Sequence, residues 1–167
     1  MKELLFLRHG KSSWLNTNIN DHDRPLSKRG INNAPKMGDI INKLCPDLEL
    51  VLYSSSLRTK QTLDLIKKHI NLNSKIIVSP ELYLASDTII WNIINQNRSD
   101  YQKILVIAHN PGLFDVVNSI RDKRKEYILF PTCALAYVKS KTNQKNNWFQ
   151  NDFELISIFK PKEILKK

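Results

Sequence analysis

Short apolar runs that alternate with longer segments of helical periodicity restrict the fold of this chain more than any other feature. The apolar runs lie at Glu3–Leu7, Leu50–Ser54, Lys75–Ser79 and Ile104–Ala108. Helical patterns lie at Ser27–Leu44, Ser56–Ile70, Asp87–Gln96 and Gly112–Ile120. Strands that alternate with helices form mostly parallel sheets covered by helices. We therefore expect an α/β fold with a mostly parallel central sheet.

The remaining segments refine this expectation. Two β-like segments, Ala134–Val138 and Phe153–Phe159, are joined by a polar loop and can add antiparallel strands at the edge of the sheet. A polar stretch rich in Asn and Asp, Lys11–Leu26, separates the first strand from the first helix and predicts irregular structure. Pro35 lies inside the first helical pattern, so it should bend that helix or move its start.

Composition limits the class of protein. A length of 167 residues predicts one domain, residues 1–167, and 41% apolar with 25% charged residues is typical of a globular chain. The formal net charge of +10 favours anionic partners. The two cysteines, Cys45 and Cys133, form no CxxC pair, which favours a reduced cytoplasmic setting. Neither a signal peptide nor a membrane-length apolar run is present in the sequence, so we expect no membrane association.

Residues that can bind a ligand or react with it follow three of the predicted strands. Arg8, His9 and Gly10 follow the first strand, Arg58 lies just after the second, and His109 follows the Ile104–Ala108 strand. Ligands of such folds bind outside the carboxyl ends of the parallel strands. Two arginines and two histidines should therefore meet at one edge of the sheet, beside helix N-termini that favour anions.

Each of these residues also has a structural interpretation. His9 could be a histidine that bonds to a loop carbonyl, Arg58 a surface residue of a helix, and His109 a residue that caps one. Their common position at strand ends favours the functional interpretation.

This set of side chains suits phosphoryl transfer. A phosphoryl group in transit carries negative charge on its equatorial oxygens, which guanidinium groups bind in bidentate geometry. A neutral imidazole can attack phosphorus to form a phosphohistidine that water then cleaves, while a second, protonated imidazole stabilises the charge. Gly10 would let the backbone approach the phosphate. The chemistry requires no metal and no cofactor, and we expect neither.

The motifs resemble those of a known family. Arg8-His9-Gly10, LRTKQT around Arg58 and AHNPG around His109 are similar to the histidine phosphatase superfamily, also called phosphoglycerate mutase-like. RHGKSSW, DHDRPLSKRG, APKMG and HNPG, in this order, resemble the small SixA-type phosphohistidine phosphatases. The resemblance implies a three-layer α/β/α sandwich. It also implies that His9 is the phosphorylated nucleophile, and that Arg8, Arg58 and His109 complete the phosphate pocket.

Two further residues have less certain places in this scheme. Arg24, in DRPL, either contacts substrate or organises the pocket, and an ion pair with Asp21 or Asp23 is an equal alternative. The general acid is poorly marked, because Asn110 stands where the acid-phosphatase branch has an acidic residue. Glu81, after the third strand, has the position closest to the glutamate of the mutases, although it could equally be a loop residue.

The weakly marked acid bears on the substrate. Imidazole titrates near pH 6.5, roughly nine units below the pKa of an alcohol, so it leaves phosphorus with less help from an acid. We therefore predict hydrolysis of phosphohistidine on a phosphorelay or phosphotransfer protein. The alternatives are a small-molecule phosphomonoesterase that uses the same site, an inactive scaffold protein, and a basic nucleic-acid-binding module. The last lacks a basic stripe interleaved with aromatic residues, so no nucleic-acid partner is expected.

Overall fold

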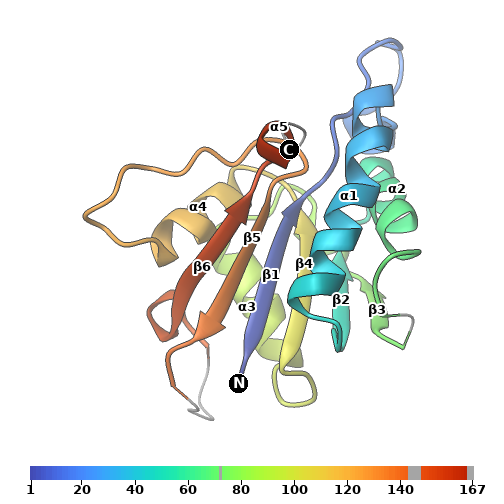
Figure 1. Cartoon of the computed structure of the whole chain (residues 1–167). Coiled ribbons are helices and arrows are strands. Elements are labelled where there is room, and N and C mark those ends of the chain that lie inside the picture. The colour runs from blue at the N-terminus through green and yellow to red at the C-terminus, as the bar shows by residue number, and fades with distance from the viewer. Residues whose placement is uncertain (72, 143–147, 165–167) are drawn as a thin grey trace.

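A six-stranded sheet in the order β3-β2-β4-β1-β5-β6 forms the middle layer of the computed structural model, which describes residues 1–71, 73–142 and 148–164 (Figure 1). Its strands are β1 (Glu3–Arg8), β2 (Leu50–Tyr53), β3 (Lys75–Val78), β4 (Lys103–Ala108), β5 (Leu135–Ser140) and β6 (Phe153–Phe159). β1 to β4 pair in parallel, and β5 runs antiparallel to both of its neighbours. The mostly parallel sheet predicted from the sequence is therefore confirmed.

Helices cover both faces of this sheet. They are α1 (Lys28–Leu44), α2 (Leu57–Ile66), α3 (Asp87–Asn97), α4 (Gly112–Ile120) and the short α5 (Pro161–Ile164). α1 and α2 pack on the face that carries Leu5 and Leu7, whereas α3 and α4 pack on the face that carries Leu4 and Phe6. Because successive side chains of a strand point to opposite faces, β1 contributes to both cores. The fold is a three-layer α/β/α sandwich, as expected.

Three helices begin at serine caps. Ser27 accepts a hydrogen bond from the backbone N–H of Gly30 (3.3 Å), and Ser56 and Ser86 cap α2 and α3 in the same way. Such a cap satisfies one of the free N–H groups of the first turn. α1 starts directly after Ser27 and runs through Pro35, so the proline does not move the start of this helix.

Several segment boundaries differ from the sequence prediction, most of them by one residue, and the ends of α2 and β5 differ by more. α2 ends at Ile66, four residues before the predicted end near Ile70, and the chain then turns as the His69 N–H donates to the Ile66 carbonyl (2.8 Å). Ile70 is nevertheless buried. Its apolar side chain therefore packs in the core although the residue lies outside the helix. β5 extends from Leu135 to Ser140, slightly beyond the predicted segment. Part of the predicted polar loop before β6, residues 143–147, lies outside the described residues.

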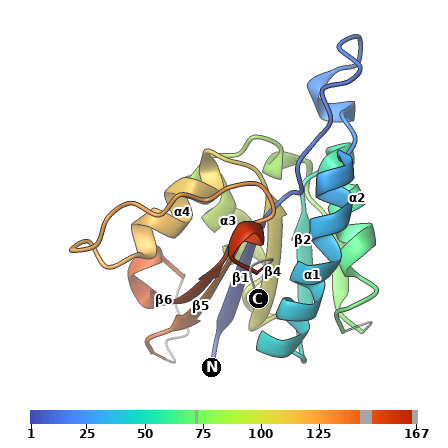
Figure 2. The same ribbon diagram turned by 45° about the horizontal axis from the view of Figure 1, so that its top comes forward.

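The segment between β1 and α1 extends past the carboxyl ends of the parallel strands (Figure 2). It contains a single turn of 3₁₀ helix, η1 (Asp21–Asp23), and a second such turn, η2 (Pro80–Leu82), follows β3. A third turn, η3 (Gln150–Asp152), precedes β6. Within the described ranges, the helices are all too short or too polar to cross a bilayer.

Candidate active site

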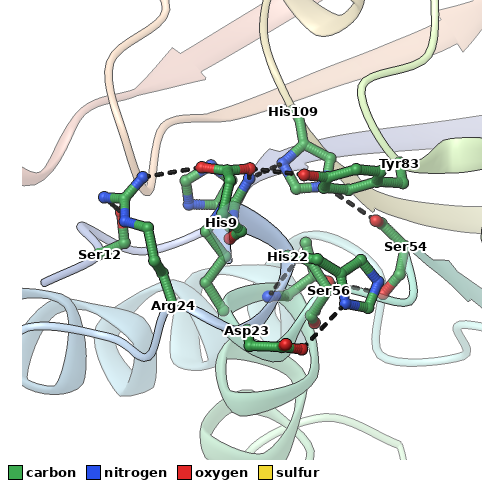
Figure 3. Close-up of polar contacts among 12 residues, drawn as sticks. His9, Ser12, His22, Asp23, Arg24, Ser54, Ser56, Tyr83 and His109 are labelled. Atoms are coloured by element: carbon green, nitrogen blue, oxygen red, sulfur yellow. Dashed lines mark hydrogen bonds and ion pairs between the residues drawn. The ribbon is translucent and has the colours of Figure 1, made fainter. Parts of the chain in front are cut away.

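Residues from three strand ends meet at the carboxyl edge of the sheet. His9 follows β1, Arg58 lies in the first turn of α2 after β2, and His109 follows β4. The ring centroids of His9 and His109 are 5.0 Å apart, and Nη2 of Arg58 lies 3.4 Å from Nδ1 of His109 (Figure 3). All three side chains are buried. The register of the parallel strands causes this meeting, because Leu7 pairs with Ile107 and Ile107 pairs with Tyr53.

Arg8 borders the same cluster. Its Nη1 donates to the carbonyl oxygen of Phe130 (3.0 Å), which also accepts from the Asn110 side chain (3.0 Å). Its Nε is buried and has no hydrogen-bond partner in the part of the chain that the structure describes. Burial lowers the pKa of Arg8, and the charge of Arg58 lowers this pKa further. The pocket therefore holds two close positive charges and a buried N–H donor without an acceptor.

The hydrogen bonds of His9 define its tautomer. Its Nδ1 lies 2.7 Å from the carbonyl oxygen of Gly10. A carbonyl can only accept, so Nδ1 carries the proton and Nε2 of the neutral ring keeps its lone pair. Burial lowers the pKa of His9 to about 4, and the charges of Arg58 and Arg8 act in the same direction, against the bond to Gly10. His9 is thus a neutral imidazole near pH 7, the form that a nucleophile requires.

His109 has the opposite tautomer. Because the Arg58 guanidinium can only donate, Nδ1 of His109 is the acceptor and its Nε2–H donates to Ser54 Oγ (2.8 Å). Burial lowers the pKa of His109 to about 3, with further lowering by His9 and Arg58. Burial and the neighbouring cations thus oppose a positive charge on this ring, and the protonated second imidazole expected during phosphoryl transfer stays a prediction.

Arg24 enters the site from the segment between β1 and α1. Its Nη1 forms an ion pair with Asp21 (2.9 Å), its Nε donates to the Ser13 carbonyl (3.1 Å), and its Nη2 donates to Ser12 Oγ (2.5 Å). The indole ring of Trp14 covers the guanidinium, at 3.2 Å from Cζ to the ring centroid. The alternative of an ion pair with Asp21 is thus present in the structure. The charge of Arg24 still reaches the pocket, because it lowers the pKa of His9.

Gly10 has a packing reason in the fold, and its expected approach to phosphate stays a prediction. A Cβ on Gly10 would lie 3.1 Å from a methyl carbon of Leu26 and 3.2 Å from Cα of Gly30. A Cβ on Gly30 would in turn press on the Lys11 carbonyl oxygen. The two glycines allow α1 to lie against the first motif, and the Gly10 N–H donates to Thr62 Oγ1 of α2 (3.0 Å). Close approach of two chain segments accounts for Gly10 without reference to a ligand.

Glu81 lies on η2 and its side chain is exposed. Its Oε2 accepts a hydrogen bond from Ser79 Oγ (2.9 Å), a contact within its own turn. Tyr83, two residues later, contacts the cluster instead, with its ring edge-to-face on His109 at 5.5 Å between centroids. The proton-donor role of Glu81 stays a prediction.

Three site residues were missed by the sequence reasoning. Asp21 accepts hydrogen bonds from Arg58, Arg24 and Tyr83, and the Tyr83 bond is the main reason that the pKa of Asp21 lies well below its usual range. His22 packs edge-to-face on Tyr83 and bonds to Ser55 Oγ (2.9 Å). The DHDRPL motif was the available signal for Asp21 and His22, whereas nothing in SPELYLAS distinguished Tyr83 from a core aromatic residue.

The described residues contain no group of three His, Cys, Asp or Glu side chains arranged to hold a metal ion. The arrangement can bind a tetrahedral anion with guanidinium and imidazole groups, and it presents a nucleophilic nitrogen beside that anion.

The lowered pKa values predict acid sensitivity. A histidine that titrates near pH 6.5 when unfolded but near 4 when folded binds more protons in the unfolded state between these values, so lowering the pH favours unfolding. We expect the free energy of unfolding to fall by on the order of 3 kcal/mol for His9 between pH 6.5 and 4, with His109 adding to it. Urea unfolding in phosphate-free buffers measures this. The His109→Gln variant should show a shallower dependence, and a flat profile from pH 6.5 to 4.5 would contradict the burial of neutral histidines.

Comparisons with known proteins identify the family of this chain. Residues 4–83 match the histidine phosphatase superfamily (branch 1). The chloroplastic protein At3g52155 of Arabidopsis thaliana is 32% identical over 151 residues, which cover 85% of this chain and 68% of that protein. Rv1276c of Mycobacterium tuberculosis is 32% identical over 105 residues, or 63% of each chain.

A solved structure, the protein histidine phosphatase SixA complexed with tungstate, has the same fold. Its TM-score is 0.80 at 22% sequence identity, and the alignment covers 97% of this chain and 99% of that one. The matched segment of this chain contains Arg8, His9 and Arg58, the residues that the structure brings together. The chain therefore belongs to the histidine phosphatase superfamily.

Proposed function

We propose that this protein is a phosphatase that hydrolyses phosphohistidine on another protein through a covalent intermediate at His9. One observation carries the proposal: the free Nε2 of a neutral, buried His9 lies in a pocket bordered by Arg8, Arg58 and His109. The pocket combines a nucleophile with donors for the oxygens that surround it. Family membership and the likeness to SixA support a phosphatase activity.

Two displacement steps at phosphorus account for the reaction. In the first, His9 Nε2 forms a bond to phosphorus, and the bond from phosphorus to the substrate nitrogen breaks. The electron pair of that bond stays on the substrate nitrogen, and the substrate ring, whose other nitrogen carries a proton, leaves as neutral imidazole. Arg58 and Arg8 stabilise the charge on the equatorial oxygens, and the unpartnered Nε of Arg8 gains an acceptor. In the second step, water attacks phosphorus and releases phosphate and free His9. The Gly10 carbonyl stabilises the positive imidazole between these steps, through the Nδ1–H bond.

The nature of the leaving group favours phosphohistidine. Glu81 is exposed and bonded to Ser79, and the two histidines of the cluster are neutral. None of these three residues is therefore a strong proton donor for the leaving group. An alkoxide with a conjugate pKa near 15 needs such a donor, whereas imidazole, with a pKa near 6.5, departs more readily. The substrate that this pocket serves best therefore has a phosphorus–nitrogen bond.

The rim of the pocket fits a substrate that is itself a protein. Trp14 and Leu15, on the segment that follows β1, are 65% and 97% exposed, although both are large and apolar. A protein that inserts a phosphorylated side chain into the pocket would cover this segment and remove apolar surface from water. The positive net charge of +10 favours an acidic partner. The free, buried Cys45 and Cys133 support the proposed cytoplasmic location.

A substrate panel tests the proposal. Hydrolysis of a phosphohistidine-bearing phosphotransfer domain is compared with that of sugar phosphates, glycerate phosphates and 4-nitrophenyl phosphate. We expect kcat/KM to be highest for the phosphoprotein by at least about tenfold. A small ester that exceeds the phosphoprotein by orders of magnitude would instead assign the protein to the small-molecule phosphomonoesterases.

The same panel defines the role of Glu81. If Glu81 donates the proton to the leaving group, Glu81→Gln should lower the rates for alkyl esters more than the rate for phosphohistidine, because only an alkoxide depends strongly on that proton. Equal losses on both classes would give Glu81 another role. Asp87→Asn, which removes a partly exposed carboxylate from the first turn of α3, is the matched control.

A further inference from the structure

The carboxylate of Asp21 accepts the hydrogen bonds that a phosphate would accept. Its Oδ1 bonds to Arg24 Nη1 (2.9 Å), and its Oδ2 bonds to Arg58 Nη2 (2.9 Å) and to the Tyr83 hydroxyl (2.6 Å). The main-chain oxygen of Asp21 accepts from Arg58 Nη1 (2.5 Å) as well. Two guanidinium groups and one phenol thus converge on a single anionic side chain of the protein itself.

The donors in this contact are fixed, whereas the carboxylate is accessible. Arg24 and Arg58 are 6% and 3% exposed, but the side chain of Asp21 is 45% exposed. Asp21 lies on η1, within the segment that extends past the end of the sheet (Figure 2). Arg24 keeps its bonds to Ser12 and Ser13 without Asp21. The side chain that can move away most easily is therefore the carboxylate.

We propose that Asp21 competes with phosphate for Arg58 and Arg24, and that its return to these guanidinium groups promotes release of the product. The inference rests on the proposed function, because it takes these arginines to be phosphate ligands. A carboxylate and a phosphate oxygen cannot both accept the same N–H. Two anions that share these donors also repel each other.

Competition by Asp21 would promote the release of inorganic phosphate. Inorganic phosphate carries up to two negative charges, and Arg8, Arg24 and Arg58 would retain it after the second displacement step. With Asp21 present, the empty pocket already has a counter-charge, so departure of phosphate does not leave buried guanidinium groups without an acceptor. Asp21 therefore lowers the affinity for the product without removing any donor that the transition state uses.

Binding of inorganic phosphate to the whole protein tests the proposal, with titration calorimetry of the wild type, Asp21→Asn and Asp23→Asn. The amide in Asp21→Asn has nearly the same shape and can still accept from Tyr83, so the fold is preserved. Asp23→Asn is the matched control, because it removes the same charge from the same 3₁₀ turn while its side-chain contact is with His22. We expect phosphate to bind about tenfold more tightly to Asp21→Asn and within about twofold of the wild type to Asp23→Asn.

Unchanged or weaker phosphate binding by Asp21→Asn would overturn the proposal and make Asp21 a residue that positions Arg58. A crystal structure with tungstate gives a second readout: the proposal requires the Asp21 carboxylate to leave Arg58 when the oxyanion is bound, and retention of both bonds would refute it. These measurements need no turnover. If the substrate panel does not favour phosphohistidine, only the proposed substrate class is overturned. The phosphate titration separately tests whether Asp21 lowers the affinity for phosphate. Absence of phosphate binding in every variant would overturn both.

Discussion

Replacement of His9 by alanine is expected to lower kcat on any phosphorylated substrate by at least about 10⁴-fold, because no other side chain of the cluster presents a free nitrogen lone pair to the bound phosphoryl group. His109 is neutral too, but its Nδ1 faces the Arg58 guanidinium and its Nε2 carries the proton that bonds to Ser54. Phosphate binding should remain in His9→Ala, since the arginines are unchanged. The measurement is single-turnover hydrolysis, with acid quenching to detect phosphorylated enzyme.

His69→Ala is the control for this variant. His69 bonds to Asp39 (2.8 Å) on the outside of α1, so its removal should change kcat by less than about twofold. A covalent phosphoenzyme should form in the wild type and in His69→Ala. If His9→Ala keeps more than about one hundredth of the wild-type rate, or if it still forms the phosphoenzyme, His9 is not the nucleophile.

Arg58→Ala is expected to lower kcat/KM by about 10³-fold. Arg58 is buried beside His109, and its guanidinium contacts both Asp21 and the imidazole, so it can present several N–H donors to phosphate from one fixed position. Arg58→Lys should recover at most about tenfold of this loss, because a single ammonium group cannot reproduce the fork of donors. Steady-state kinetics of both variants measures the effect.

Lys60→Ala is the matched control, since Lys60 is an exposed cation on the same helix, α2. It should retain kcat/KM within about twofold of the wild type. Thermal unfolding of each variant separates lost catalysis from lost structure. A value of kcat/KM for Arg58→Ala within tenfold of the wild type would show that this guanidinium does not stabilise the transition state.

Both predictions concern residues that could be located before any coordinates were known. Arg8 ends β1, and His9 and His109 directly follow β1 and β4. Arg58 lies in the first turn of the helix after β2, and parallel strands of one sheet end at the same edge. Their proximity is thus a consequence of local patterns and one topological rule. The same local patterns predicted the helices that became α1 and α2.

Other features depended on contacts between distant segments. Asp21 meets Tyr83 across 62 positions of sequence, inside segments that have no periodic pattern. The close packing of Gly10 on Gly30 depends on where α1 lies against the first motif. The apolar pattern also could not predict that α2 ends at Ile66, because Ile70 is buried although it lies outside the helix.

The residue types of this chain and the order of its elements were enough to predict an α/β fold with a mostly parallel sheet and the four side chains at its edge, because hydrophobic periodicity and strand direction are local properties. The three-layer arrangement was expected from the family resemblance. The tautomers of His9 and His109, their neutral state and the place of Asp21 were decided only in three dimensions. Each of these depends on burial and on hydrogen-bond partners that the fold brings from other elements, and neither quantity can be read from neighbouring residues in the chain.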